Sequence, residues 1–306
     1  MPDRSINDLL SDFLVQSRVN ASVFATPSVC GAWRINTTGM HRLGFHLVAR
    51  GTCWLHMRGF AAPEALRAGD LLVVRGDHWH LLSPEVELDG EDMLLPEGGS
   101  GRRTDLICGS ISFPDSMAEA LLNSLPQLVL LRTGEGETDT RLETLARLMA
   151  IEARSADSGR QVVLDRLADI LLVMVLRHVM ARGLVRSGLL AALADPRLSR
   201  ALAALHQEPG AAWTLAGLAE CAGMARTAFA QRFAAIMGDT PMNYLATWRM
   251  QQADRLLRDR RLSVAQVAEQ LGYSTEAAFR RAFKRIRGVG PGEVRRIRGR
   301  GPPVNW

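Results

Sequence analysis

The chain has 306 residues, of which 47% are hydrophobic and 23% are charged, and its net charge is +5. This length favours two domains, and the ordinary composition excludes a disordered or fibrous chain. The longest apolar run, 170–176, ends at Arg177, and residues 1–12 are polar and acidic. Neither a membrane span nor a signal peptide is therefore expected, which predicts a cytoplasmic protein without a membrane partner.

Positive charge is concentrated toward the C-terminus. From Asp195 onward, 18 Lys and Arg stand against 9 Asp and Glu, a net charge of +9, and the preceding residues carry a net charge of −4. An acidic front and a basic back are typical of a sensor joined to a nucleic-acid binder. The alternative, a basic face that only keeps the protein soluble, is less favoured because the basic residues coincide with the repeats described below.

The N-terminal third has the pattern of a small β domain. Residues 1–20 form an amphipathic helical pattern, and from Ser22 to Ile111 the hydrophobic period changes to two. Turn signals at Gly39, Gly51 and Gly69 separate the apolar runs. Short strands at this spacing predict a small β-barrel or jelly roll. The strand-like runs are 23–24, 32–35, 45–48, 53–57, 70–74 and 105–108.

Two segments of this region carry a family resemblance. Residues 69–80, Gly-Asp-Leu-Leu-Val-Val-Arg-Gly-Asp-His-Trp-His, resemble the second cupin motif, and residues 45–51 resemble the end of the first. The resemblance implies a cupin-like barrel with inward histidines. Either His78 or His80 can take the usual histidine position, and on one strand the two would share a face. The stretch 85–103, rich in Gly, Glu and Asp, is interpreted as a mobile loop.

Helical periodicity resumes after Phe113. Helices are predicted at 115–125, 138–155 and 160–182, and Asp195-Pro196 has the residues of a helix start. The third helix either forms a dimer interface or packs only on its own barrel. We interpret 184–193 as a linker. The apolar stripe of the third helix consists of Val163, Leu167, Ile170, Leu171, Met174 and Val175.

The C-terminal third contains one pattern twice, at 218–233 and 267–284. Each copy has a small alanine, then a glycine four residues later where a tight turn needs positive φ, then two phenylalanines four apart that anchor a second helix. A helix predicted at 241–258 connects the copies. The repeated residues are Ala219, Gly223, Phe229 and Phe233 in the first copy and Ala268, Gly272, Phe279 and Phe283 in the second.

This region resembles the DNA-binding domain of the AraC/XylS family of bacterial transcription regulators over its whole length, and 283–291 resembles that family's C-terminal signature. Ala225 stands where a serine usually caps the first recognition helix. A cupin-type sensor ahead of paired helix-turn-helix motifs is common in the family, and the pattern around Cys53, Gly69 and Cys108 is similar to regulators that respond to reactive chlorine species. The resemblance implies double-stranded DNA, a second copy of the chain, RNA polymerase and an effector or oxidant as partners.

These observations predict an α+β architecture with three parts: a cupin-like sensor at 1–114, a helical extension with a dimerisation helix and linker at 115–194, and an all-α DNA-binding domain with two helix-turn-helix motifs at 195–306. We expect a sequence-specific transcription regulator, more often an activator in similar proteins, and no enzymatic activity. The alternative is a metal-dependent cupin enzyme, such as a dioxygenase or isomerase, with a helical appendage. The duplicated helix-turn-helix argues against that alternative.

Base readout requires exposed polar residues on the second helix of each motif. Arginine can pair with guanine, glutamine with adenine and glutamate with cytosine, whereas Lys284, Arg285 and Arg287 are expected at phosphates. An exposed solubilising role is the alternative for each of them. The expected DNA-binding residues are Arg226, Thr227, Ala230, Gln231, Thr275, Glu276, Ala277, Arg280, Arg281 and Lys284.

Cysteines and histidines supply two hypotheses for sensing. None of the four cysteines forms a CxxC pair, which argues against a structural zinc site. Cys108 matches a cysteine position of the chlorine-responsive subfamily, and its oxidation, for example to a disulfide with Cys30, is one hypothesis. Cys53 is the third candidate sensor cysteine. His46, His78 and His80 are candidate metal ligands in the barrel, but no carboxylate completes the cupin set, so satisfied structural histidines without a cofactor are favoured.

Overall fold

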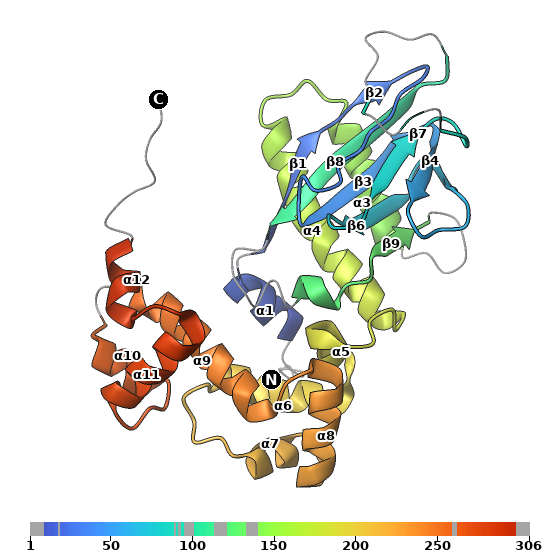
Figure 1. The fold of residues 1–306 in the computed structure, drawn as a ribbon. Coiled ribbons are helices and arrows are strands. Elements are labelled where there is room, and N and C mark those ends of the chain that lie inside the picture. The colour runs from blue at the N-terminus through green and yellow to red at the C-terminus, as the bar shows by residue number, and fades with distance from the viewer. Residues whose placement is uncertain are drawn as a thin grey trace, which may run out of the picture. The chain divides into compact units, whose positions relative to one another are not determined.

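The computed structural model describes residues 9–17, 19–88, 90, 93–94, 101–112, 121–132, 140–258 and 262–297. The chain forms two compact units, one of residues 13–186 and one of residues 187–306 with residues 1–12 (Figure 1). Helix α1 (Leu9–Ser17) spans the first boundary. Among the described helices, none is both long enough and apolar enough to cross a membrane.

Two antiparallel sheets form the barrel of the first unit. The larger sheet has the strand order β1-β8-β3-β6-β9, with β2 also paired to β8, and the smaller has the order β5-β4-β7. This confirms the predicted cupin-like β domain. The strands are β1 (Asn20–Ala25), β2 (Ser28–Val29), β3 (Leu43–Arg50), β4 (Thr52–Met57), β5 (Glu64–Arg67), β6 (Leu71–Arg75), β7 (His80–Ser83), β8 (Thr104–Ser112) and β9 (Leu128–Leu131).

Strand prediction succeeded where turn glycines bound an apolar run and failed elsewhere. Gly39, Gly51 and Gly69 all have positive φ, as the turn signals predicted. The run 32–35 forms only isolated bridges, and β5, β7 and β9 were not predicted, because four-residue strands carry too little periodicity to be recognised. Most of the expected loop 85–103 lies outside the described residues.

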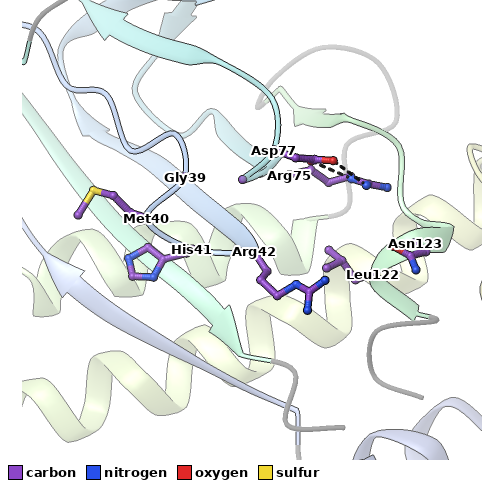
Figure 2. Close-up of a pocket in the computed structure, with 9 residues that line it drawn as sticks. Gly39, Met40, His41, Arg42, Arg75, Asp77, Leu122 and Asn123 are labelled. Atoms are coloured by element: carbon purple, nitrogen blue, oxygen red, sulfur yellow. Dashed lines mark hydrogen bonds and ion pairs between the residues drawn. The ribbon is translucent and has the colours of Figure 1, made fainter. Parts of the chain in front are cut away.

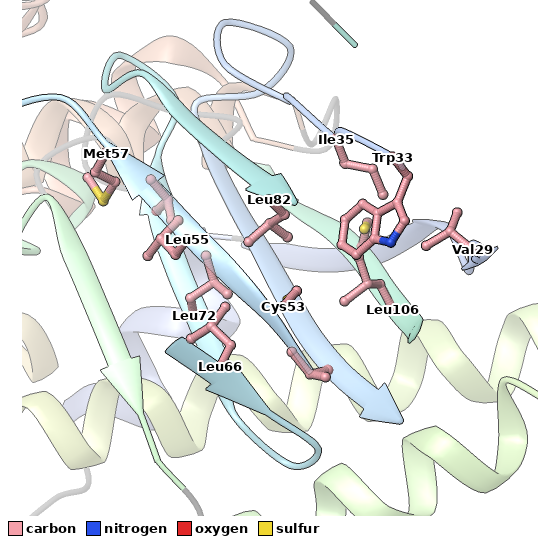
Figure 3. Packing of buried hydrophobic residues seen from close by; sticks show 13 residues of the cluster. Val29, Trp33, Ile35, Cys53, Leu55, Met57, Leu66, Leu72, Leu82 and Leu106 are labelled. Carbon is pink, nitrogen blue, oxygen red and sulfur yellow. The ribbon is translucent and has the colours of Figure 1, made fainter. Parts of the chain in front are cut away.

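The central strands are buried on both faces. In β3, residues 43–48 are all buried. Val48 belongs to one buried apolar cluster with residues of both sheets. Figure 3 shows Cys53, Leu55 and Leu72 of this cluster gathered between the strands. The opposite face of the strand lies under helix α3 (Thr140–Glu152). A strand in this position has no polar face, which is why its apolar run is nearly continuous.

Helix α4 (Arg160–Ala181) closes the open edge of the larger sheet. The carboxylates of Asp165 and Asp169 accept hydrogen bonds from the backbone N–H groups of Val23 and Ala21 in β1, each at 2.8 Å. Four residues of helix rise about 6 Å, close to the rise of two strand residues, so the two carboxylates match alternate N–H groups. The helix thus satisfies the edge that would otherwise pair with another strand.

The structure corrects one prediction for the segment between the barrel and the C-terminal helices. The helix expected at 115–125 lies mostly outside the described residues, and its described end, 121–124, is helical. The expected linker 184–193 is wrong in its second half, because Gly188–Ala194 forms helix α5. Residues 189–193 are all buried in that helix, and α5 contacts α6 (Pro196–Gln207) and α8 (Arg226–Met237). Packing with the C-terminal helices explains why this apolar segment is not an exposed connection.

The helices that follow α6 form the two predicted helix-turn-helix motifs. The first motif is formed by α7 (Leu215–Cys221) and α8, and the second by α10 (Val264–Gln270) and α11 (Glu276–Arg287). Helix α9 (Pro241–Leu257) connects them as predicted, and α12 (Pro291–Ile297) follows. Gly223 and Gly272 adopt positive φ at the two turns, and all four anchoring phenylalanines are buried.

The two recognition helices differ at their N-termini. The Thr275 side chain accepts a hydrogen bond from the Ala278 N–H and caps α11, whereas Ala225 precedes α8 without a side-chain cap. Ala225 already has the extended backbone of a capping residue, with φ −63° and ψ 143°. Helix α8 therefore lacks one hydrogen bond that its equivalent has.

Ala225→Ser is expected to raise the free energy of unfolding of the DNA-binding unit by about 1 kcal/mol, because the serine hydroxyl can accept a free N–H of the first turn. Urea denaturation followed by circular dichroism measures the change. Thr275→Ala serves as the matched control and should lower the same quantity by about as much. An unchanged midpoint for Ala225→Ser would show that this N–H group is already satisfied.

Candidate nucleic-acid interface and buried sensor core

The structure brings the expected DNA-binding residues onto two equivalent faces. In each motif the buried phenylalanine pair holds the second helix against the core and leaves the opposite face outward. Of the ten residues, only Ala230 and Glu276 are partly buried and the others are exposed. Arg226, Thr227, Ala230 and Gln231 lie on or beside α8, and Thr275, Glu276, Ala277, Arg280, Arg281 and Lys284 on or beside α11.

Two of these residues pair with each other in the free protein. Glu276 Oε1 accepts from Arg280 Nε at 2.6 Å, one helical turn away. The pair is largely exposed, so its contribution to stability is small and either partner can exchange it for a base edge. Glu276 is therefore held on the recognition face with its charge balanced, while Arg281, the next residue, takes part in no such pair in the described chain.

Helix α8 is fixed by a buried carboxylate that the sequence did not single out as a site. Asp195 Oδ1 caps α6 by accepting from the N–H groups of Arg197 and Leu198 at 2.9 and 3.0 Å. Its other oxygen accepts from Arg232 Nε at 2.7 Å. Burial alone would raise the pKa of Asp195, and the hydrogen bonds from Leu198, Arg232 and Arg197 more than offset this and lower it. Arg232 is thus tied to the scaffold.

A chain of hydrogen bonds crosses the barrel interior from β8 to β7. His46 Nδ1 lies 3.1 Å from Cys108 Sγ, and His46 Nε2 lies 3.1 Å from Thr37 Oγ1. The same hydroxyl lies 2.9 Å from His80 Nε2. His80 Nδ1 lies 3.0 Å from the carbonyl oxygen of His78, which can only accept. Thr37, which no sequence pattern indicated, therefore joins the two histidines.

The carbonyl at the end of this chain determines where the protons are. Burial lowers the pKa of His80, and burial followed by the neighbouring His80 and His41 lowers the pKa of His46 to about 3, so both rings are neutral near pH 7. His80 Nδ1–H donates to the carbonyl, which leaves its Nε2 to accept from the Thr37 hydroxyl. His46 Nε2–H then donates to Thr37 Oγ1, and His46 Nδ1 accepts the Cys108 thiol proton.

The structure gives Cys108 a different neighbouring cysteine from the one that the sequence suggested. Cys108 lies opposite Ala25 in the sheet, whereas Val29, next to Cys30, lies opposite Thr104. Four strand residues span about 13 Å, too far for a disulfide between Cys30 and Cys108. Cys53 instead shares the buried apolar cluster with Cys108. Burial, and then the proximity of Cys53, raise the pKa of Cys108 to about 12.

The three candidate metal ligands do not converge. His80 is buried, which answers the question of which histidine faces the interior. His78 lies in a turn before β7 with its ring 3.6 Å from Asp77, so the two histidines do not share a strand face as expected. Among the described residues, no group of three His, Cys, Asp or Glu side chains is placed to hold a metal ion.

A surface pocket of about 340 Å³ lies at one end of the same unit (Figure 2). Its walls come from the loop before β3, the turn after β6 and residues 122–123. Arg75 pairs with Asp77 on one wall, and His41 Nε2 is buried without a hydrogen-bond partner in the described chain. The lining residues are Gly39, Met40, His41, Arg42, Arg75, Gly76, Asp77, Leu122 and Asn123.

Comparisons with known proteins agree with these two sites. Residues 8–181 match the family described as Cupin, and residues 218–297 match the family described as Helix-turn-helix domain. The chain is 34% identical over 301 residues to a putative AraC-like transcription regulator of Streptomyces lividans, covering 95% of this chain and 97% of the relative. A second such regulator, from Streptomyces antibioticus, is 32% identical over 95% of this chain and 98% of its own length.

A relative with a named signal is also similar. The RCS-specific HTH-type transcriptional activator RclR of Escherichia coli K12 is 30% identical over 248 residues, covering 74% of this chain and 86% of its own length. These relatives are named as transcription regulators. The chain belongs to the AraC family of DNA-binding transcription regulators, with a cupin-type domain in front of its two helix-turn-helix motifs.

Proposed function

We propose that this regulator works in the cytoplasm as a homodimer that contacts RNA polymerase, activates transcription, and changes its DNA affinity when a small oxidant reaches Cys108. DNA binding itself follows from the family. The hydrogen bond between Cys108 and His46 is the observation that supports the choice of signal, and the exposed faces of α8 and α11 support the choice of DNA-contacting residues.

Arg281 is the residue that we expect to contribute most to base readout. It is exposed in the middle of the α11 face, and a guanidinium can form two hydrogen bonds with guanine. Arg281→Ala should weaken binding to a selected cognate duplex by about 1–3 kcal/mol, which is about fivefold to 150-fold, and relax the preference at one base pair. Fluorescence anisotropy with single-base variants of that duplex measures both effects.

Arg102→Ala is the matched control because it removes an equal charge from an exposed position just before β8, outside both the DNA-binding unit and the α3 and α4 surface. It should leave the affinity and the base preference unchanged. Equal affinity of Arg281→Ala and the parent chain for the cognate duplex would remove Arg281 from the set of base contacts.

The buried position of Cys108 restricts the oxidant that it can meet. The side chain is 1% exposed, so a small uncharged oxidant such as hypochlorous acid is the class that can reach the sulfur atom. The raised pKa disfavours the reactive thiolate, and the hydrogen bond to His46 Nδ1 is the route by which the thiol proton leaves during the attack. Oxidation to a sulfenic acid releases HCl, and condensation with Cys53 would then release water and form a disulfide. The disulfide removes the S–H donor of His46 and leaves a buried acceptor unpaired, which costs about 1–3 kcal/mol. The sulfenic acid keeps a hydroxyl donor but places an oxygen atom between the sulfur atom and His46. We expect the reduced and the oxidised barrel therefore to differ in stability and in packing.

Hypochlorite titration of the full chain, followed by intact-mass thiol counting and then dithiothreitol, tests the proposal. Cys108 should be oxidised at low equivalents and restored by the reductant, with DNA affinity changing in step. Cys53→Ser should stop at the sulfenic acid, and Cys30→Ser should behave as the parent. If Cys108→Ser responds to hypochlorite as the parent does, the signal is read elsewhere.

Two helices of the sensor unit provide a surface for a second copy of the chain. The apolar stripe of α4 divides in the structure, since Leu167, Leu171 and Val175 pack inside the unit whereas Val163 and Ile170 are 42% and 47% exposed. Helix α3, packed beside α4, exposes further large apolar side chains at 46% and 58%. Exposed apolar residues gathered on paired helices are typical of an interface. These α3 residues are Leu148 and Ile151.

Ile170→Lys should shift the chain from dimer to monomer in sedimentation velocity, because the ammonium would be buried in the interface without a partner. Val86→Lys places the same charge on an apolar residue of equal exposure, 47%, outside the helical layer, and should remain dimeric. Dimers that persist in Ile170→Lys at low protein concentration would place the interface elsewhere.

The pocket beside His41 is the second candidate for signal entry. Its lining includes Arg42, Asn123 and the Arg75–Asp77 ion pair, which suits a small polar molecule better than an apolar one. If the thiols of the parent chain stay silent toward hypochlorite, thermal-shift screening of small carboxylates against His41→Ala is the next measurement. The oxidant proposal itself needs no metal, because Thr37 already satisfies the nitrogens that His46 and His80 turn toward each other.

A further inference from the structure

One arginine occupies the same place in both halves of the DNA-binding unit. Arg200 in α6 and Arg249 in α9 each lie 23 residues before the turn glycine of the motif that follows. A Cβ atom added at Gly223 would lie 3.3 Å from Arg200 Nη2, and one added at Gly272 would lie 3.1 Å from Arg249 Nη2. Both guanidinium groups therefore rest against the turn of a helix-turn-helix.

The two arginines bind different partners. Arg200 Nη2 donates to the carbonyl oxygen of Ala222 at 3.1 Å, inside its own motif. Arg249 instead donates from Nε to the carbonyl of Pro209 at 2.6 Å and from Nη2 to the carbonyl of Ala211 at 2.8 Å. These two carbonyls belong to the loop between α6 and α7, so the guanidinium of the second half holds a loop of the first.

The loop also touches the second motif directly. A Cβ atom at Gly210 would lie 2.1 Å from the carbonyl oxygen of Gln270, and one at Gly272 would lie 2.3 Å from the carbonyl oxygen of Gly210. The two backbones are in contact at a distance that excludes any side chain. Arg249 covers this contact, with Cζ 5.8 Å from the centroid of the Tyr273 ring.

We infer that Arg249 is a positioning residue that fixes the distance and rotation between the two recognition helices, and so makes DNA binding depend on the spacing of two base-pair boxes. Helix α9 packs against α8 of the first motif and against α10 and α11 of the second, and this is the first connection between the motifs. The contact of Gly210 with Gln270 and Gly272 adds a second connection beside the helix, and the Arg249 hydrogen bonds hold the loop that makes this contact against α9. Two rigidly spaced helices accept only boxes that face them on the same side of the duplex.

The probe is a duplex selected by the parent full-length chain from a randomised double-stranded library, together with versions that have one base pair inserted or removed between its two protected boxes. One base pair rotates one box by about a tenth of a turn relative to the other. The parent should lose about tenfold in affinity on either change. Arg249→Ala should bind the selected duplex more weakly but lose no more than about threefold when the spacing changes.

Arg200→Ala is the matched control, because it removes the equivalent guanidinium without disconnecting the two motifs. It should keep the tenfold dependence on spacing. General destabilisation would lower affinity for all three duplexes equally, so the ratio separates positioning from folding. Two further variants replace Arg249→Ala if that variant loses its helical circular dichroism. Arg249→Lys cannot donate to both carbonyl oxygens at once, because an ammonium lacks the planar fork of a guanidinium. Gly210→Ala disrupts the backbone contact, and both variants should also reduce the dependence of affinity on box spacing.

Three results would overturn the inference. The first is a parent chain that selects a single box or tolerates both spacing changes. The second is an Arg249→Ala variant, or folded Arg249→Lys and Gly210→Ala variants, with the full tenfold dependence. The third is an Arg200→Ala variant that loses the dependence to the same extent.

Discussion

In each unit of this chain, buried polar groups form hydrogen bonds with partners that are far apart in the sequence, and these pairs hold the elements of that unit together. In the sensor unit, the N–H groups at the edge of β1 are accepted by Asp165 and Asp169 of α4. In the DNA-binding unit, Asp195 joins the start of α6 to Arg232 of α8. Apolar burial drives the association of these elements, and the polar pairs determine their register, because a shift by one residue would leave a buried group without a partner.

The same requirement supports the proposal that a thiol inside the barrel reports on an oxidant. Cys108 takes part in a chain whose protons are all assigned from one carbonyl oxygen, so no member can rotate or change tautomer independently. A chemical change at the sulfur atom therefore alters the hydrogen bonding of His46 and the segment that carries Thr37. Such fully connected networks have two states, intact or broken, which is the behaviour that a switch requires.

The two helix-turn-helix motifs show how one pattern acquires two roles. Both retain the buried phenylalanine pair and the positive-φ glycine, because these residues build the turn and anchor the recognition helix. They differ in the cap of that helix and in the partner of the arginine beside the turn. The shared residues are those that fold each motif, and the differing ones adjust stability and connect the motifs to each other.

The sequence by itself determined the α+β fold, the helices that carry the repeats, and the two outward faces that we propose to contact DNA. Those features follow from local spacing, since a helix period or a turn glycine acts within a few residues. Tertiary structure alone decided that 188–194 is a buried helix, that His80 and not His78 lies inside, that Thr37 joins His46 to His80, and that Cys53 replaces Cys30 as the neighbour of Cys108. Each of these depends on contacts between residues distant in the chain, which no local pattern contains.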